Sequence, residues 1–210
     1  KFTESESSET VLNKYFKKFF LSKKIWCASS THKVEEKISA SVHLMLKKKY
    51  KNILTIIIPR HINRIPEIIN ELEELDLKIH LHSSRDKIKN NTDIYLVDAY
   101  GKTKMFFSIC NIVFLGGSLI GHGGQNPLEA ARYNCQILHG PNIWNFREIY
   151  NLLRRLKVSQ KITNIRQIVK KISIILNNKK KNKDIQFKLN SLSKNILKLT
   201  LIEINNQIIK

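Results

Sequence analysis

Short runs of β-branched and other apolar residues recur through the first 140 positions, and they alternate with stretches whose apolar residues are spaced for one face of a helix. Runs such as 53–58 are apolar almost throughout, which is typical of strands buried on both faces. Val34 begins a helical spacing that extends to Leu46, and Pro66 stands in the first turn of another predicted helix, which ends near residue 75. The alternation predicts an α/β fold, a Rossmann-like parallel sheet with helices on both faces. The predicted strands are residues 25–28, 53–58, 77–81, 94–97, 112–115 and 136–138.

The pattern changes after Phe146, where the strand signal fades and helical spacing continues. Three helices are predicted there, over residues 149–156, 165–175 and 185–199, with a lysine- and asparagine-rich linker at 177–183. The first 24 residues begin acidic and then carry aromatic side chains among lysines, as a lead-in helix that packs on a neighbour would. We therefore expect a lead-in segment over 1–24, a Rossmann-like domain over 25–158 and basic C-terminal helices over 159–210.

The chain is strongly basic, with 37 lysines and arginines against 17 acidic residues and a formal net charge of +20. The excess is greatest in residues 151–210, where 15 basic residues face only Asp184 and Glu203. Such a surface attracts anionic lipid headgroups, nucleic acid or acidic substrates alike, and codon bias toward lysine, isoleucine and asparagine would produce the same charge. Phe187 is the one aromatic residue of this stretch, which argues against a tail that stacks on nucleic-acid bases.

The sequence also favours a particular compartment. No apolar stretch approaches the roughly 18 to 20 residues of a membrane-spanning helix. The three cysteines, Cys27, Cys110 and Cys135, are scattered among apolar or small residues, which favours buried thiols over a disulfide framework. The first ten residues lack the basic start and apolar run of a signal peptide and do not begin with Met. We expect a cytoplasmic setting and a chain that is the latter part of something longer.

All seven glycines fall between residues 101 and 140. In a parallel α/β sheet, ligands bind beyond the carboxyl ends of the strands, and glycine lets the backbone approach them closely. Two phosphate-binding motifs are excluded. The Gly101-Lys102-Thr103 stretch ends like a P-loop but has Leu96 where that motif requires glycine, and residues 121–126 fail the third position of the dinucleotide fingerprint. A nicotinamide cofactor is therefore not expected.

Three loops that follow predicted strands carry groups suited to a nucleotide. Arg60, after the second strand, can fork onto phosphate oxygens, and residues 98–102 form the loop after the fourth. Asn126 is placed to cap a helix whose first turn holds Pro127 and Glu129, and the free N–H groups there suit an anion. The Glu129 carboxylate can accept hydrogen bonds from both hydroxyls of a ribose, although dipole matching at a helix start explains it equally well. Together these groups predict a site for a nucleoside monophosphate or a sugar nucleotide.

The seven histidines do not form a metal-ligand pattern. His80 and His82 share one face of a strand but lack a carboxylate or thiolate partner at ligand spacing, and no metal site is predicted. His32 and His61 follow the first and second strands at one edge of the sheet. We expect these two to contact a ligand or the loop around it.

A series of motifs runs in order through residues 1–150. They are Lys1-Phe2, Ser30-Thr31-His32, Pro59-Arg60-His61, Asp98 to Gly101, Gly116-Gly117-Ser118-Leu119, Gly123-Gly124-Gln125-Asn126-Pro127-Leu128-Glu129, Gly140-Pro141 and Asn145-Phe146. This series resembles the bacterial Kdo transferases, which add 3-deoxy-D-manno-octulosonic acid (Kdo) to lipid A precursors. The stretch from the Gly-Gly-Ser-Leu motif to the Asn-Pro-Leu-Glu motif is highly specific.

The resemblance implies the C-terminal, donor-binding half of a two-domain GT-B glycosyltransferase, with CMP-Kdo as its donor and no metal or other cofactor. It assigns CMP binding to Pro59, Arg60, Tyr100, Gly101, Lys102, Asn126, Pro127, Leu128 and Glu129, and transition-state stabilisation to Lys1. It places Ser30, Thr31, His32, His61, Gly117 and Ser118 along the donor site. Two positions depart from the family pattern, because Lys33 and Lys102 stand where the family usually has glutamate.

The resemblance also implies inverting transfer of Kdo to a lipid A precursor in lipopolysaccharide synthesis. It places the reaction at the cytoplasmic face of the bacterial inner membrane, with this portion peripheral on the anionic surface. The family's general base and membrane anchor belong to the N-terminal half, so we expect the chain alone to bind CMP without transferring Kdo. Two alternatives stay open: a non-catalytic nucleotide-binding remnant, and a basic nucleic-acid-binding protein.

Overall fold

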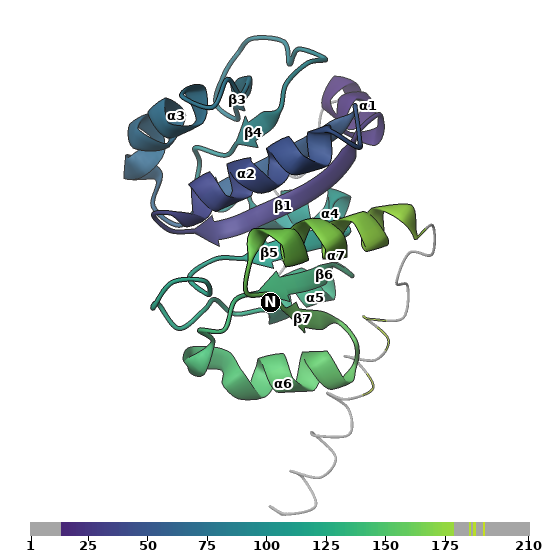
Figure 1. Cartoon of the computed structure of the whole chain (residues 1–210). Coiled ribbons are helices and arrows are strands. Elements are labelled where there is room, and N and C mark those ends of the chain that lie inside the picture. Colours follow the sequence, from purple (N-terminus) through teal and green to yellow (C-terminus); the bar gives the residue numbers. More distant parts are fainter. Residues whose placement is uncertain (1–13, 179–184, 186, 188–190, 192–210) are drawn as a thin grey trace, which may run out of the picture.

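In the computed structural model, which describes residues 14–178, 185, 187 and 191, seven strands form one parallel sheet (Figure 1). The strands are β1 (Lys24–Thr31), β2 (Ile53–Pro59), β3 (Ile79–Leu81), β4 (Ile94–Leu96), β5 (Ile112–Leu115), β6 (Gln136–His139) and β7 (Ser159–Lys161). Their spatial order is β3-β4-β2-β1-β5-β6-β7, and each neighbouring pair is parallel. The direction in which strands are added therefore reverses at β1, the kind of position where α/β sheets bind ligands.

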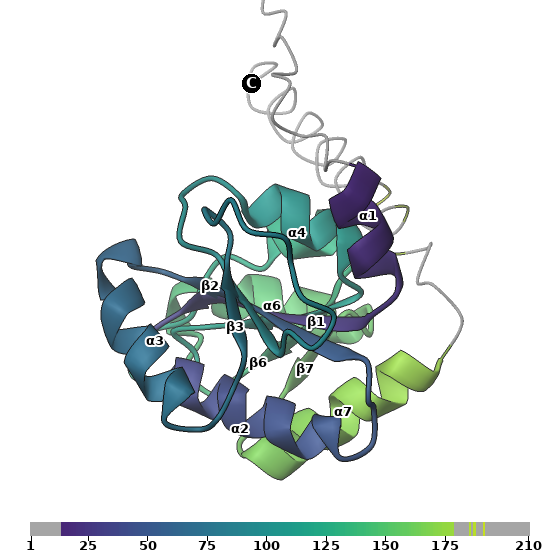
Figure 2. The same ribbon diagram turned by 90° about the horizontal axis from the view of Figure 1, so that it is seen from above.

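Helices cover both faces of the sheet. Figure 2 shows α1 and α4 on one side and α2 and α7 on the other. Core contacts place α5 and α6 with the first pair and α3 with the second. The helices are α1 (Lys14–Leu21), α2 (Glu35–Lys47), α3 (Ile65–Glu73), α4 (Thr103–Ile109), α5 (Leu128–Arg132), α6 (Arg147–Arg155) and α7 (Ile165–Asn177), with 3-10 turns η2 (Ile62–Arg64) and η3 (Trp144–Phe146).

The central strand β1 contributes to a core on each face of the sheet. Ile25 and Cys27 belong to the core beneath α1 and α4, whereas Trp26 and Ala28 belong to the core beneath α2 and α7. Successive side chains of a strand point to opposite faces, so a strand covered on both sides must be apolar at every position. The α/β fold with a parallel sheet covered on both faces is confirmed, as are the six predicted strands.

The lead-in region supplies α1, whose aromatic residues complete one of these cores. The Phe20 ring lies 5.3 Å from that of Tyr95 and 6.3 Å from that of Phe106, both edge to face. Edge-to-face aromatic pairs contribute about 0.5 to 1.5 kcal/mol beyond the area that they bury. The neighbour on which α1 packs is therefore the sheet of this same chain. Residues 1–13, with Lys1, lie outside the described part.

Strand β7 was not predicted. Its residues are polar, and of the three only Ser159 is buried, because β7 is a short strand at the edge of the sheet. The domain boundary expected after residue 158 falls directly before this strand, which pairs with β6. Beyond it, Ile168 and Ile172 of α7 are buried in one core with Trp26. Residues 159–177 thus share the core of the sheet, and the helix expected over 185–199 lies largely outside the described residues.

A strained backbone position marks the turn between β1 and α2. The Glu35 N–H donates to the His32 carbonyl, and Val34, the third residue of this turn, has φ 81°. That position of such a turn favours glycine, whereas a β-branched residue with positive φ is strained. The Val34 side chain is 53% exposed and loses little packing if removed.

We expect Val34→Gly to raise the free energy of unfolding by about 0.5 to 1 kcal/mol. Relief of roughly 1 to 2 kcal/mol of left-handed strain exceeds the conformational entropy that glycine adds to the unfolded chain. Urea unfolding measures the change. Val34→Ala keeps a Cβ and serves as the control, so an equal gain from alanine would show that the backbone strain is not the cause.

Candidate functional site

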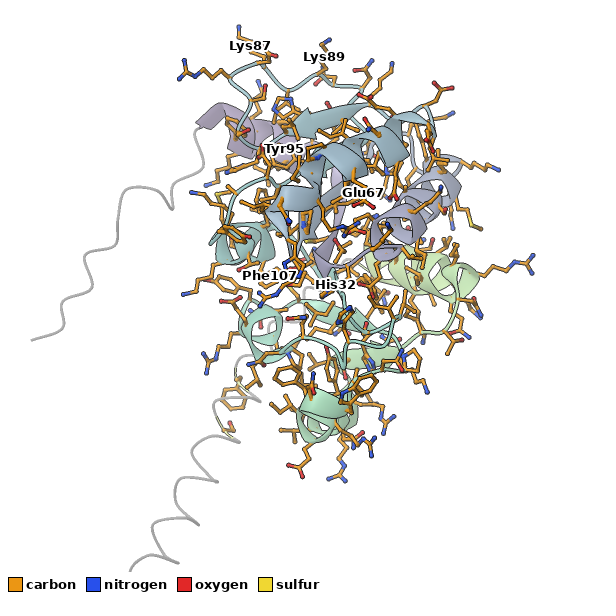
Figure 3. The ribbon with its side chains drawn as sticks, turned by 90° about the vertical axis from the view of Figure 1, so that its left-hand side faces the viewer. His32, Glu67, Lys87, Lys89, Tyr95 and Phe107 are labelled. Atoms are coloured by element: carbon orange, nitrogen blue, oxygen red, sulfur yellow. The ribbon has the colours of Figure 1, made fainter. Side chains whose placement is uncertain are left out.

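A cavity of about 880 Å³ opens at the carboxyl edge of the sheet, where β1, β2, β4 and β5 end. Its walls come from the loops after these strands and from α4 and α5. Figure 3 looks onto this edge and shows Phe107 of the cavity wall and His32 on the same face of the molecule. Small-molecule sites typically occupy about 300 to 1,000 Å³, so the cavity is large enough for a sugar nucleotide.

An irregularity in β1 shapes the floor of the cavity. The pairing register between β1 and β2 shifts from Ser29 to Thr31, and Ser30 between them has φ 55°. A bulge of this kind bends the strand and redirects a side chain. Ser29 and Ser30 both line the cavity as a result, whereas Thr31 is buried and does not.

The loop after β2 brings Arg60 to the cavity. Pro59 ends the strand, and the Arg60 N–H donates to the Thr31 carbonyl at 2.9 Å, which ties this loop to the end of β1. Both residues line the cavity. Among the described residues, no hydrogen bond or ion pair engages the Arg60 guanidinium, so its five N–H donors are available to a ligand.

The loop after β4 forms the opposite wall. Tyr100, Gly101 and Lys102 all line the cavity, and Gly101 has φ 75°, a conformation that favours glycine. The Thr103 hydroxyl, in the first turn of α4, donates to Glu129 Oε2 at 3.2 Å. This hydrogen bond joins the β4 loop to α5 and orients the Glu129 carboxylate at the cavity wall.

The third wall is the loop that leads into α5. Asn126 Oδ1 accepts the N–H of Leu128 at 3.0 Å and so supports the start of the helix, but the N-cap is Pro127, one residue later than predicted. The Tyr150 hydroxyl donates to the Gln125 carbonyl at 2.9 Å and anchors the loop to α6. Gln125, Asn126 and Leu128 line the cavity, while Pro127 between them is buried and does not.

Most residues predicted to bind CMP therefore meet in one cavity. The eight that line it are Pro59, Arg60, Tyr100, Gly101, Lys102, Asn126, Leu128 and Glu129. Of those predicted to line the donor site, Ser30 reaches the cavity, whereas Thr31, His32, His61, Gly117 and Ser118 lie outside its lining. Gly117 and Ser118 are buried beside it, and their N–H groups donate hydrogen bonds to a buried carboxylate.

The residue that holds them is Glu35, which sequence reasoning missed. Its side chain is fully buried at the start of α2 and accepts four backbone N–H groups. The donors are His32 and Gly117 to Oε2, at 3.0 and 2.7 Å, and Ser118 and Leu119 to Oε1, at 3.2 and 3.0 Å. Its position shortly after the Ser-Thr-His motif could have indicated a role at the site. An acidic residue in the first turn of a helix is, however, ordinarily explained by its favourable interaction with the helix dipole.

The electrostatics of the cavity favour an anionic ligand. The basic residues Arg60, Lys102, Lys104 and Arg132 line it, against the carboxylate of Glu129. Basic groups in a concave site raise the local concentration of anions. A phosphate would be attracted to this cavity, and the Glu129 carboxylate would suit hydroxyl groups rather than the phosphate itself.

In the described part of the chain, no helix is long and apolar enough to cross a bilayer. Nor does that part hold a group of three or more histidine, cysteine, aspartate or glutamate side chains arranged to bind a metal ion.

The parallel Rossmann-like sheet, with a basic cavity at its switch point, has the fold of the C-terminal domains of GT-B glycosyltransferases. No protein-family model matches the chain. Its fold matches the C-terminal CMP-Kdo binding domain of WaaA from Acinetobacter baumannii, with a TM-score of 0.71 and 25% sequence identity, over 75% of this chain and 82% of that one. The chain is related to the 3-deoxy-D-manno-octulosonic acid transferases and is similar to their C-terminal domain in sequence and fold.

Three curated relatives show the extent of the similarity. The Haemophilus influenzae 3-deoxy-D-manno-octulosonic acid transferase is 35% identical over 129 residues, and that of Rickettsia prowazekii is 32% identical over 149 residues, which cover 61% and 71% of this chain. A bifunctional glycosyltransferase/methyltransferase of Fusobacterium nucleatum is 33% identical over 211 residues and 96% of this chain. The alignments cover 30% to 32% of these relatives, so the chain spans about a third of their length.

Proposed function

We propose that the chain is the donor-binding domain of a Kdo transferase and holds CMP-Kdo in the cavity at the carboxyl edge of its sheet. The observation that carries the proposal is the convergence of eight residues of the CMP-binding motifs on one basic cavity. The solved CMP-Kdo binding domain with the same fold supports the choice of nucleotide.

The cavity walls suit the parts of CMP. The Arg60 guanidinium, which has no other partner among the described residues, forks onto the phosphate oxygens. The Glu129 carboxylate, oriented by Thr103, accepts the two ribose hydroxyls. Gly101 lines the cavity with no described atom within 4 Å of its Cβ position, so the backbone there is open to the nucleotide.

In the complete enzyme this domain supplies the leaving-group side of the reaction. A hydroxyl of a lipid A precursor attacks the anomeric carbon of Kdo with inversion, without a metal, and CMP departs. Arg60 and the other basic residues of the cavity neutralise the charge that develops on the departing phosphate. The general base and the acceptor site come from an N-terminal half, and Lys1 stabilises charge in the transition state. The basic surface of the chain rests on the anionic cytoplasmic face of the inner membrane.

We expect Arg60→Ala to weaken CMP binding by on the order of 1.5 to 3 kcal/mol, the scale of a hydrogen bond to a charged group. Cytidine, which lacks the phosphate, should bind nearly unchanged. Titration calorimetry with both ligands measures the contrast, and Arg85→Ala, an exposed arginine outside the cavity lining, is the matched control. Equal losses for CMP and cytidine would assign Arg60 a structural role, and no CMP binding by the unaltered chain would reject the proposed function.

A further inference from the structure

Three histidines from three separate loops meet beside the cavity. His32 follows β1, His61 follows β2 and His122 lies in the loop after β5. The rings of His32 and His122 stack with their centroids 4.3 Å apart and their planes 19° apart. The His61 ring meets that of His32 edge to face at 5.6 Å. We call these three residues the histidine cluster.

The histidine cluster adjoins the cavity at two points. Gly117 lies between the histidine cluster and the cavity. A Cβ placed on it would be 3.3 Å from His32 Nε2 and 3.4 Å from the side-chain nitrogen of Gln125, which lines the cavity. Arg60, which also lines the cavity, directly precedes His61 and lowers the pKa of His32 by its charge. A ligand whose phosphate meets Arg60 is therefore bound beside the loop that carries His61.

The cluster contains an unsatisfied polar atom. His32 is 8% exposed, and its Nε2 is buried without a hydrogen-bond partner among the described residues. A buried polar atom without a partner is destabilising unless a ligand supplies one. His61 and His122 are exposed, so the cluster is open to solvent on one side.

The carboxylates near the cluster in the described part of the chain are engaged elsewhere. Glu35 is engaged by four backbone N–H groups, and Glu36 pairs with Arg64 at 3.0 Å. Lys33 points to Glu67, at 3.1 Å. Burial, together with the charges of His122, His61, Arg60 and Arg64, lowers the pKa of His32 to about 4. The ring is therefore neutral near pH 7 and lies in a positive field that would attract an anion.

The donor named by the proposed function carries such an anion. Kdo is an octulosonic acid, so CMP-Kdo presents a carboxylate on the carbon next to the glycosidic phosphate bond. We propose that the histidine cluster is the subsite for this carboxylate and that one of its imidazoles takes up a proton from solvent when the donor binds. This inference rests on the proposed function, because it requires the nucleotide to occupy the cavity.

The proton uptake has a definite sign. A carboxylate against the rings favours the imidazolium, so the pKa of one histidine is higher in the complex than in the free protein. Binding is then strengthened below the pKa of the complex and loses that strength as the pH rises through it. For one proton taken up, the affinity falls by up to about tenfold per pH unit over that range. CMP lacks the carboxylate, and its phosphomonoester, whose second pKa is near 6, loses charge as the pH falls, so CMP should not gain affinity toward pH 6.

Titration calorimetry of the whole chain between pH 6 and pH 8 tests this, with freshly prepared CMP-Kdo and with CMP. Repeating each titration in two buffers of different ionisation enthalpy counts the protons. We expect CMP-Kdo binding to take up a fraction of a proton from solvent, approaching one at pH 6, and the affinity for CMP-Kdo to fall toward pH 8. Because the phosphate of CMP itself titrates near pH 6, the proton count of CMP-Kdo binding, rather than its difference from CMP, decides the test. Binding of CMP-Kdo without net proton uptake would overturn the inference.

Substitutions in the histidine cluster test whether it takes up the proton. We expect His122→Asn, at an exposed position, and His32→Asn to lower the affinity for CMP-Kdo about tenfold or more and to abolish the proton uptake, with CMP affinity within about twofold. Lys33→Gln removes a nearby positive charge that is exposed and paired with Glu67, and should leave both ligands unaffected. Unchanged CMP-Kdo affinity in His122→Asn, or an equal loss in Lys33→Gln, would overturn the inference. Loss of CMP binding by the unaltered chain would instead count against the proposed function.

Discussion

Glu35→Ala is expected to lower the free energy of unfolding by about 4 kcal/mol or more, because a single carboxylate satisfies four backbone N–H groups in and around the Gly-Gly-Ser-Leu loop. Each buried donor left without a partner costs about 1 to 3 kcal/mol. The total is a large fraction of the 5 to 15 kcal/mol by which domains are typically stable. Urea unfolding followed by circular dichroism measures the loss.

Two further variants sharpen this test. Glu35→Gln keeps the size of the side chain and one acceptor oxygen but turns an NH₂ group toward N–H donors, so we expect an intermediate loss. Glu73→Ala, at an exposed position at the end of α3, should change stability by no more than about 0.5 kcal/mol. A loss below about 1 kcal/mol for Glu35→Ala would show that water replaces the carboxylate and that the loop does not depend on it.

Gly140→Ala is expected to lower stability by about 3 kcal/mol or more. A Cβ at this position, directly after β6, would overlap the carbonyl group of Ser118 and lie 2.6 Å from the Leu119 nitrogen. These are backbone atoms, which cannot move aside by a change of rotamer, and overpacking of this kind costs about 1 to 3 kcal/mol or more. The Gly140 N–H also donates to Ser118 Oγ at 2.8 Å, so the same shift would break a hydrogen bond.

Gly121→Ala is the matched control for Gly140→Ala. Gly121 lies in the same glycine-rich region, has no atom within 4 Å of its Cβ position and does not have positive φ. Alanine there should leave the thermal unfolding midpoint nearly unchanged. If both variants lost equal stability, the close approach between β6 and the Gly-Gly-Ser-Leu loop would not be the cause.

The carboxyl-edge loops were predictable because the residues that line the cavity stand in short sequence motifs directly after strongly predicted strands. Residues 53–58 are unmistakably a buried strand, so Arg60 had to lie at the carboxyl edge. The same reasoning placed Tyr100 to Lys102 and Asn126 to Glu129 at that edge. A parallel sheet brings all such ends together, which is why the cavity could be expected before its geometry was seen.

Side chains that act across long sequence separations could not be found in this way. Glu35 bonds to Gly117, 82 residues away, and His122 stacks on His32. Neither residue has a local pattern that distinguishes it from a helix-start acid or a surface histidine. Their roles follow from the order of strands, because β1 and β5 are neighbours in the sheet although three other strands lie between them in sequence.

The pattern of apolar residues determined the class of fold, because burial on both faces of a strand requires apolar side chains at successive positions and covering helices require a 3.6-residue period. The same pattern determined which loops meet at the carboxyl edge of the sheet. Tertiary structure alone decided that β7 joins the sheet, since a polar edge strand such as Ser159–Lys161 is held by backbone pairing to β6 rather than by its side chains. It alone decided that Glu35 is buried beneath a loop and that three histidines gather beside Arg60, since hydrogen bonds and ring contacts between distant segments exist only once the sheet has brought those segments together.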